Sequence, residues 1–160
     1  MKKIYLVSDD KYMREDVLKT IDSINENKYR VVEKNLNQLE DVFEEFADLA
    51  VLPLDWEPER KMGNKIIPPP QRDYNNLLNF RGISLAKGLQ ENRFSGKIIL
   101  TIEGSYSLKF DEKVRRLFNP NEESYLRLMS GTPFVNLYSR VHSEDAKKNR
   151  FLNSLEGKPQ

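Results

Sequence analysis

Acidic side chains follow two apolar runs of the sequence, at the point where each run ends. Asp9 and Asp10 follow the run 4–7 after a single residue, Ser8, and Asp55 comes directly after the largely apolar run 48–54. If both runs are parallel strands of one sheet, their carboxyl ends meet at the same edge, where open α/β sheets form their sites. Carboxylates gathered at one edge suit Mg²⁺, which takes oxygen ligands and keeps several waters. Asp9, Asp10 and Asp55 are therefore candidate metal ligands, with Mg²⁺ as the expected ion.

Other kinds of chemistry are excluded or disfavoured by composition. The sequence has no cysteine, which rules out disulfides, thiol nucleophiles and cysteine-bound zinc, and its single histidine, His142, rules out a histidine-rich metal site. No glycine-rich loop follows the run 4–7, which argues against nucleotide phosphate binding there. The formal net charge is +1, so composition gives no sign of nucleic-acid binding.

The elements that must position these side chains alternate along the chain. The predicted strands cover residues 4–7, 28–33, 48–54, 97–102 and 133–138. The predicted helices cover residues 13–24, 36–46, 83–89, 111–118, 122–129 and 144–155. Alternation of this kind predicts a doubly wound, flavodoxin-like α/β fold: a five-stranded parallel sheet with helices on both faces. Asp9 or Asp10 is also placed to cap the first helix, because a short carboxylate accepts from its free amides.

The length of 160 residues suits one domain, and we expect a single domain over residues 1–160. An inserted Pro/Asn-rich loop over 57–80 interrupts the alternation, and such a loop is either functional or a tolerated surface insertion. We expect residues 156–160 to be a frayed tail. No apolar run reaches the length of a membrane helix, and the N-terminus lacks the pattern of a signal peptide. The expected location is the cytoplasm.

Three stretches resemble the receiver (CheY-like) domain of two-component response regulators. They are LVSDDKYMREDVLKTI at 6–21, DLAVLPLDWEP at 48–58 and GISLAKGLQENRFSGKIILTI at 82–102. They are similar, in that order, to the family's first strand with its acidic pair, to its phospho-acceptor strand, and to its third helix and fourth strand. The likeness covers residues 3–102 well and the rest loosely.

The resemblance implies a role for each matching residue. Asp9, with Asp10 or Ser8, would be the metal-binding acidic pair, and Asp55 would be the phospho-acceptor. Thr101 would be the switch hydroxyl that turns toward the phosphoryl group. The family's lysine after the fifth strand has no clear counterpart here, and Arg140 or Lys109 could supply the cation that pairs with a phosphoryl group.

The position of the acceptor is open in this sequence. Counting from Asp48 in the common receiver pattern places it at Pro53, which cannot be phosphorylated, whereas aligning on Asp-Trp places it at Asp55. Because the lysine is also missing, we favour a degenerate pseudo-receiver over one that takes part in a phosphorelay. The alternative for Asp55 is a solvated loop acid, and for Thr101 an ordinary strand residue.

The expected function is therefore regulatory. We expect a signalling module that acts through protein–protein interaction with a kinase or a regulatory target, with Trp56 as a partner contact unless it packs under the insertion. The alternative is an enzyme, a Mg²⁺-dependent phosphoryl-handling or hydrolytic protein that uses the strand-end carboxylates; we favour no enzymatic activity. We expect no nucleic acid and no membrane as partner, and the oligomeric state is left open.

Overall fold

A five-stranded parallel sheet forms the centre of the protein. The computed structural model describes residues 2–8, 10–24, 28–34, 47–54, 60–67, 81–91, 97–102 and 135–156. The strands of the sheet are β1 (Lys2–Val7), β2 (Tyr29–Lys34), β3 (Leu49–Pro53), β6 (Lys97–Ile102) and β7 (Val135–Ser139). Their order across the sheet is β2-β1-β3-β6-β7, and every neighbouring pair is parallel. The doubly wound fold and all five predicted strands are confirmed.

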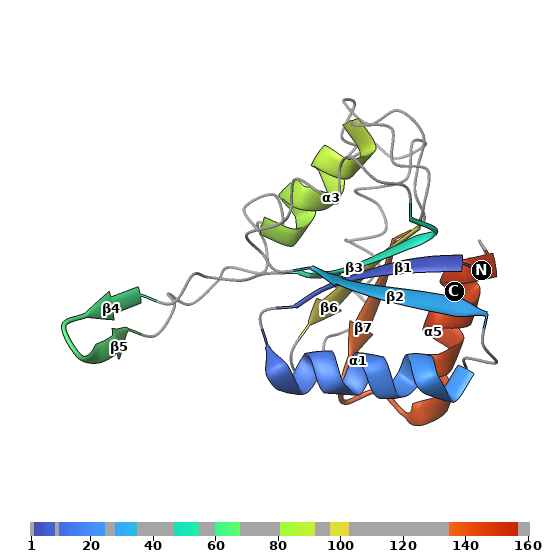
Figure 1. Ribbon diagram of the computed structural model, residues 1–160, viewed down its shortest axis with the longest axis horizontal. Coiled ribbons are helices and arrows are strands. Elements are labelled where there is room, and N and C mark those ends of the chain that lie inside the picture. The colour runs from blue at the N-terminus through green and yellow to red at the C-terminus, as the bar shows by residue number, and fades with distance from the viewer. Residues whose placement is uncertain are drawn as a thin grey trace.

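Helices cover both faces of this sheet, as predicted. The described helices are α1 (Lys11–Ile24), α3 (Arg81–Glu91) and α5 (Glu144–Glu156). Helices α1 and α5 lie on one face and α3 lies on the other (Figure 1). None of these three helices is long and apolar enough to span a membrane. The helices predicted over 36–46, 111–118 and 122–129 lie outside the described residues.

The core between the sheet and the pair α1 and α5 follows from two periodicities. In the strands, alternate residues face these helices, as Ile4 and Leu6 of β1 do. In α1 the buried residues Met13, Val17 and Ile21 recur every four positions, which keeps them on one face. Each fully buried large apolar side chain contributes about 1.5–3 kcal/mol. This packing fixes the position of α1 along the direction of the strands.

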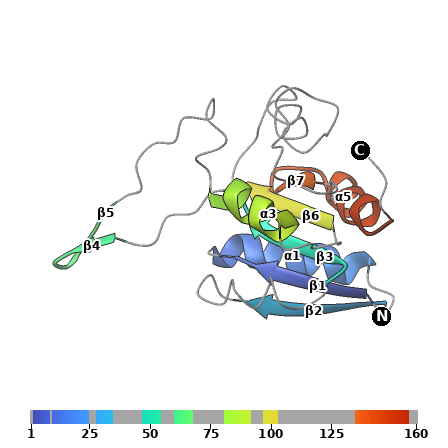
Figure 2. The same ribbon diagram turned by 90° about the horizontal axis from the view of Figure 1, so that it is seen from above.

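The segment 57–80 differs in part from the predicted loop, because residues 60–67 form a β-hairpin. Strand β4 (Arg60–Met62) pairs antiparallel with β5 (Lys65–Ile67), and Gly63 and Asn64 make the turn. Gly63 has a φ of 65°, in the left-handed region that glycine adopts without steric cost. Two-residue hairpin turns require such a residue. The hairpin stands away from the five-stranded sheet in both views (Figures 1 and 2).

Helix α3 begins in direct contact with the end of β3. The amide of Gly82 donates a hydrogen bond to the carbonyl oxygen of Leu54 at 2.8 Å. A Cβ atom added at Gly82 would lie 2.2 Å from the carbonyl oxygen of Pro53 and 2.4 Å from that of Leu54. Both neighbours are backbone atoms at a buried strand end, so neither can rotate away. Only glycine allows this approach of helix to strand.

We predict that Gly82→Ala destabilises the protein by about 1–3 kcal/mol, the usual cost of forcing atoms into a packed site. The matched control is Ser84→Ala, two residues further along the same helix at an exposed position. Because alanine favours helix, the control should leave stability unchanged or slightly raised. Urea unfolding followed by circular dichroism measures both. Equal stability of the two variants would contradict this account of the α3 contact.

Candidate functional site

The carboxyl ends of the parallel strands form the edge where the sequence placed its candidate site. At this edge the structure describes Ser8, Asp10, Thr101 and Arg140. The remaining candidates lie outside the described residues: Asp9, Asp55, Trp56 and Lys109. Their assigned roles therefore stay predictions.

Asp10 caps helix α1. Its Oδ1 atom accepts hydrogen bonds from the amides of Tyr12 at 2.7 Å and Met13 at 3.0 Å. The amide of Asp10 in turn donates to Ser8 Oγ at 3.2 Å. A cap of this kind is worth about 1 kcal/mol because it satisfies amides that have no partner inside the helix. The predicted cap is thus confirmed for Asp10, and metal binding would have to use its other oxygen, Oδ2.

The described residues include no group of three histidine or acidic side chains that could hold a metal ion. Of the three carboxylates proposed as Mg²⁺ ligands, only Asp10 is described, and it already serves the helix. A cation held by this edge would therefore depend on Asp9 and Asp55.

Thr101 stands opposite a proline. It is buried near the end of β6, and its hydroxyl donates to the carbonyl oxygen of Leu52 at 3.4 Å. In the parallel register of β3 and β6 its partner is Pro53, and the next amide, that of Leu54, donates to the Thr101 carbonyl at 2.8 Å. Asp55 follows Pro53 by two residues in the sequence. Of the two acceptor positions left open by the sequence, Pro53 is the one level with Thr101.

Arg140 lies beside the first turn of α1. It follows the last residue of β7, and its guanidinium carbon lies 5.7 Å from the centre of the Tyr12 ring. A guanidinium over an aromatic face is attracted by the ring's negative charge density. Tyr12 and Val141 are the two large apolar residues most exposed among those described, at 65% and 60%. The described part of the edge thus includes the cation of Arg140 and the exposed apolar side chains of Tyr12 and Val141.

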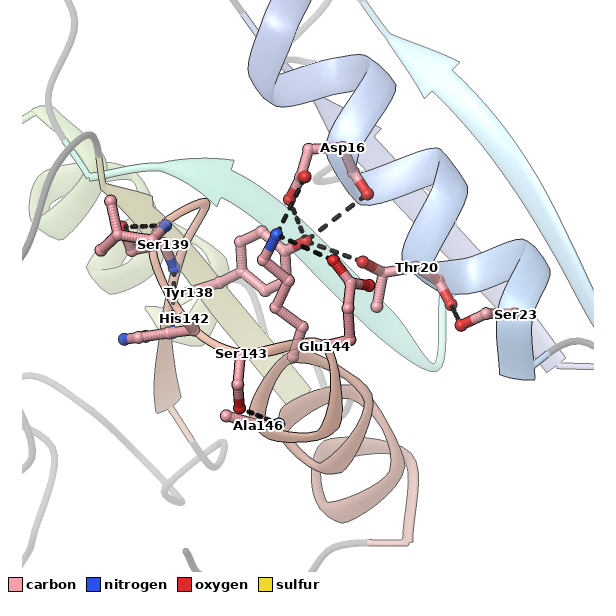
Figure 3. Close-up of polar contacts among 11 residues, drawn as sticks. Asp16, Thr20, Ser23, Tyr138, Ser139, His142, Ser143, Glu144 and Ala146 are labelled. Carbon is pink, nitrogen blue, oxygen red and sulfur yellow. Dashed lines mark hydrogen bonds and ion pairs between the residues drawn. The ribbon is translucent and has the colours of Figure 1, made fainter.

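A tight turn holds Arg140 and Val141 at the surface. The amide of Ser139 donates to His142 Nδ1 at 3.3 Å, and the amide of His142 donates to the Ser139 carbonyl at 3.2 Å. Figure 3 shows the imidazole of His142 folded back toward Ser139. The single histidine is therefore part of a turn that ends β7, close to the N-terminus of α5.

Sequence reasoning missed a buried polar cluster between α1, β7 and α5, made by Asp16, Thr20, Tyr138 and Lys147. The Tyr138 hydroxyl lies 2.5 Å from Asp16 Oδ2 and 2.9 Å from Thr20 Oγ1 (Figure 3). Lys147 Nζ lies 3.0 Å from Asp16 Oδ1. We call these four residues the α1–α5 clamp. The only sequence signal is that Asp16 and Thr20 are four residues apart, beside the apolar stripe of α1.

Burial makes the electrostatics of the clamp strong. The side chain of Lys147 is 4% exposed and that of Asp16 is 21% exposed, so the ion pair is largely removed from water. Burial, with the hydrogen bond to Asp16, raises the pKa of the Tyr138 phenol far above its usual value. The phenol therefore stays protonated and donates to the carboxylate. All four groups have partners, so the clamp fixes structure and offers no open position for a ligand.

The clamp and the edge are connected through α1. Tyr12 and Asp16 are four residues apart, so they share a face of the helix. Tyr12 meets Arg140, while Asp16 meets Tyr138, two residues earlier on the strand. Helix α1 is thus attached to the end of β7 at two successive levels, and the clamp positions the exposed Arg140.

We predict that Lys147→Met destabilises the protein by about 2–4 kcal/mol, because it leaves Asp16 without its cation in a largely buried place. The double variant Asp16→Asn/Lys147→Met should recover at least about 1 kcal/mol, because the neutral amide needs no cation. Lys148→Met, next to Lys147 in the same helix, is the control and should change little. Chemical denaturation measures all three. A Lys147→Met variant as stable as the control would refute the role of the clamp.

We also predict that the clamp weakens at high pH. An unfolded tyrosine ionises near pH 10, whereas folded Tyr138 holds its proton to higher pH. The contribution is therefore complete below pH 10 and is lost above it, at about 1.4 kcal/mol per pH unit. The free energy of unfolding of Tyr138→Phe should fall less between pH 9 and 11 than that of the unchanged protein. Equal slopes for Tyr138→Phe and the unchanged protein would disprove this assignment.

No family model and no curated protein matches the sequence. Solved structures do match. The signal receiver domain of a putative LuxO repressor protein from Vibrio parahaemolyticus is 11% identical, with a TM-score of 0.54, covering 98% of this chain and 91% of that one.

Two mutants of RitR match with TM-scores of 0.55 and 0.56, at 14% and 13% identity. The match covers 98% of this chain but 54% and 52% of theirs, so the chain spans about half the length of RitR. At such identities the likeness establishes the fold alone. The protein has the CheY-like fold of receiver domains, which its sequence predicted.

Proposed function

We propose that this chain is a receiver-like regulatory module that acts by binding a protein partner, and that its phosphorylation site is degenerate. The observation that carries the proposal is the register of β3 and β6, which pairs Pro53 with Thr101. The fold supports the first part, because this chain matches the signal receiver domain of the putative LuxO protein over nearly its full length.

The register supports degeneracy for a chemical reason. A switch hydroxyl must reach the phosphoryl group, so the acceptor carboxylate has to stand level with it. The residue level with Thr101 is Pro53, which has no group to phosphorylate. Thr101 meanwhile donates its hydroxyl to the carbonyl of Leu52, a contact within the sheet that needs no phosphoryl group. Asp55 stands further along the chain and is the acceptor only if the chain brings it back toward β6.

The other parts of the site point the same way. Asp10 uses Oδ1 to cap α1, and Arg140 stacks on Tyr12. In a phosphorylatable receiver, Mg²⁺ held by Asp9, Asp10 and Asp55 would shield the incoming charge, and Arg140 would pair with the phosphoryl group. In a pseudo-receiver Asp10 and Arg140 keep these structural roles instead. The module then signals by binding, with a kinase or a regulatory target as partner and Trp56 as a contact.

The test uses Trp56, the only tryptophan in the chain, next to Asp55. We predict no saturable change in its fluorescence when Mg²⁺ and then beryllium fluoride, a phosphoryl mimic, are added to the folded protein. Asp55→Asn should give the same flat titrations. A saturable change in the unchanged protein that is lost in Asp55→Asn would overturn the degenerate site and identify Asp55 as the acceptor.

A gain-of-function variant gives the complementary measurement. Pro53→Asp places a carboxylate level with Thr101 and near the acidic strand ends, where like charges repel unless a cation relieves them. We expect Mg²⁺ to raise the melting temperature of Pro53→Asp and to leave that of the unchanged protein as it was. The control is the same measurement with a monovalent salt in place of Mg²⁺, at matched ionic strength and in buffer free of Ca²⁺. If Mg²⁺ leaves the melting temperature of folded Pro53→Asp unchanged, position 53 is not the acceptor position.

A further inference from the structure

The β4–β5 hairpin has no third strand among the described residues. Within the described residues each of its strands pairs only with the other, whereas β1, β3 and β6 each have two neighbours. The hairpin stands apart from the large sheet in both views (Figures 1 and 2). A lone two-stranded hairpin is at best marginally stable in water, and a third strand or a packed helix is what stabilises it. The hairpin is therefore suited to gain its third strand from elsewhere.

The register shows which backbone groups would receive that strand. Met62 pairs with Lys65 next to the turn, Lys61 with Ile66, and Arg60 with Ile67. Antiparallel pairs alternate between those that exchange both hydrogen bonds and those whose N–H and C=O groups point outward. The pair that closes a two-residue turn is hydrogen-bonded, so Lys61 and Ile66 direct their backbone groups outward. Lys61 thus presents its backbone N–H and C=O groups at the outer edge of β4, and Ile66 presents its groups at the outer edge of β5.

Charge distinguishes these two edges and the hairpin as a whole. Three of the eight residues over 60–67 are basic and none is acidic, in a chain whose net charge is only +1. Two of the three, Arg60 and Lys61, belong to β4, whereas β5 holds Lys65 alone. Opposite charges on neighbouring strands favour pairing, and like charges oppose it. The edge of β4 therefore favours an acidic strand.

We propose that the β4–β5 hairpin binds an extended acidic segment of the protein partner, which adds along β4 as a third strand. This inference rests on the proposed function, in that it assumes a protein partner. Strand addition uses the open backbone of β4 for affinity, and the basic composition of β4 favours an acidic partner strand over a basic one. The hairpin sequence also contains Met62, Ile66 and Ile67, and a composition that is apolar as well as basic favours a peptide with apolar and acidic residues over a phosphate backbone.

The test measures amide hydrogen exchange over 60–67 by NMR in the full chain, with a short peptide of alternating glutamate and valine as the probe. Protection of these amides should rise by about tenfold or more at saturation, because a third strand closes the edge. The protection of the amides of β1 and β6 from hydrogen exchange should not change. A peptide of alternating lysine and valine should have no effect.

Two pairs of variants separate backbone pairing from charge. Lys61→Pro removes the outward amide of β4 and should abolish the protection, whereas Ile66→Pro removes the matching amide of β5 and should retain it. Arg60→Glu/Lys61→Glu should lose binding to the acidic peptide. Lys19→Glu/Arg30→Glu makes the same change of charge at exposed positions on α1 and β2 and should keep it.

Three results would overturn the proposal. One is unchanged exchange over 60–67 with the acidic peptide. Another is equal protection by a short duplex DNA, which would assign the hairpin to a nucleic acid. The third is protection that rises with protein concentration alone, which would assign it to a second copy of this chain. None of them depends on Trp56 or on beryllium fluoride, so failure here is distinguishable from failure of the degenerate site.

Discussion

The backbone hydrogen bonds between β3 and β6 define the register of the two strands. This register determines which side chains lie next to each other at the carboxyl ends of the strands. The pairing of Leu49 with Lys97 at one end requires Pro53 to meet Thr101 at the other. A slip of one residue would move every side chain of β3 to the opposite face of the sheet, and because every residue of β3 is buried, the packing on both faces would be lost. Core packing therefore fixes the register. The register in turn determines which residues meet at the carboxyl ends of the strands and what chemistry they can perform.

The two faces of the sheet use different means to hold their helices. On the α3 face, a glycine lets the helix approach to backbone contact with the end of β3. On the other face, α1 and α5 are joined by apolar packing and by the buried α1–α5 clamp. A buried ion pair gives little net stability but is costly to break, so it makes one arrangement of the two helices much better than its alternatives. That arrangement of α1 and α5 sets the position of the exposed Arg140.

Much of the fold was readable from the sequence. The apolar runs of β1 and β6 and the four-residue spacing in α1 predicted these elements close to their observed bounds, because burial on both faces of a strand or on one face of a helix leaves a periodic pattern. The hairpin was not predicted. Its strands have three residues each, too few for a recognisable alternation, and its turn residues, Gly63 and Asn64, are also typical of loops.

For the site, the sequence by itself determined which groups end the strands: acidic residues after β1, a threonine at the end of β6 and an arginine after β7. It left two positions for the acceptor, because a pattern along one chain does not define the pairing between two strands. Only the tertiary structure decided that Pro53 is level with Thr101, that Asp10 caps a helix and that Tyr138 meets Asp16 and Lys147. Each of these facts is a contact between elements, set by register and packing.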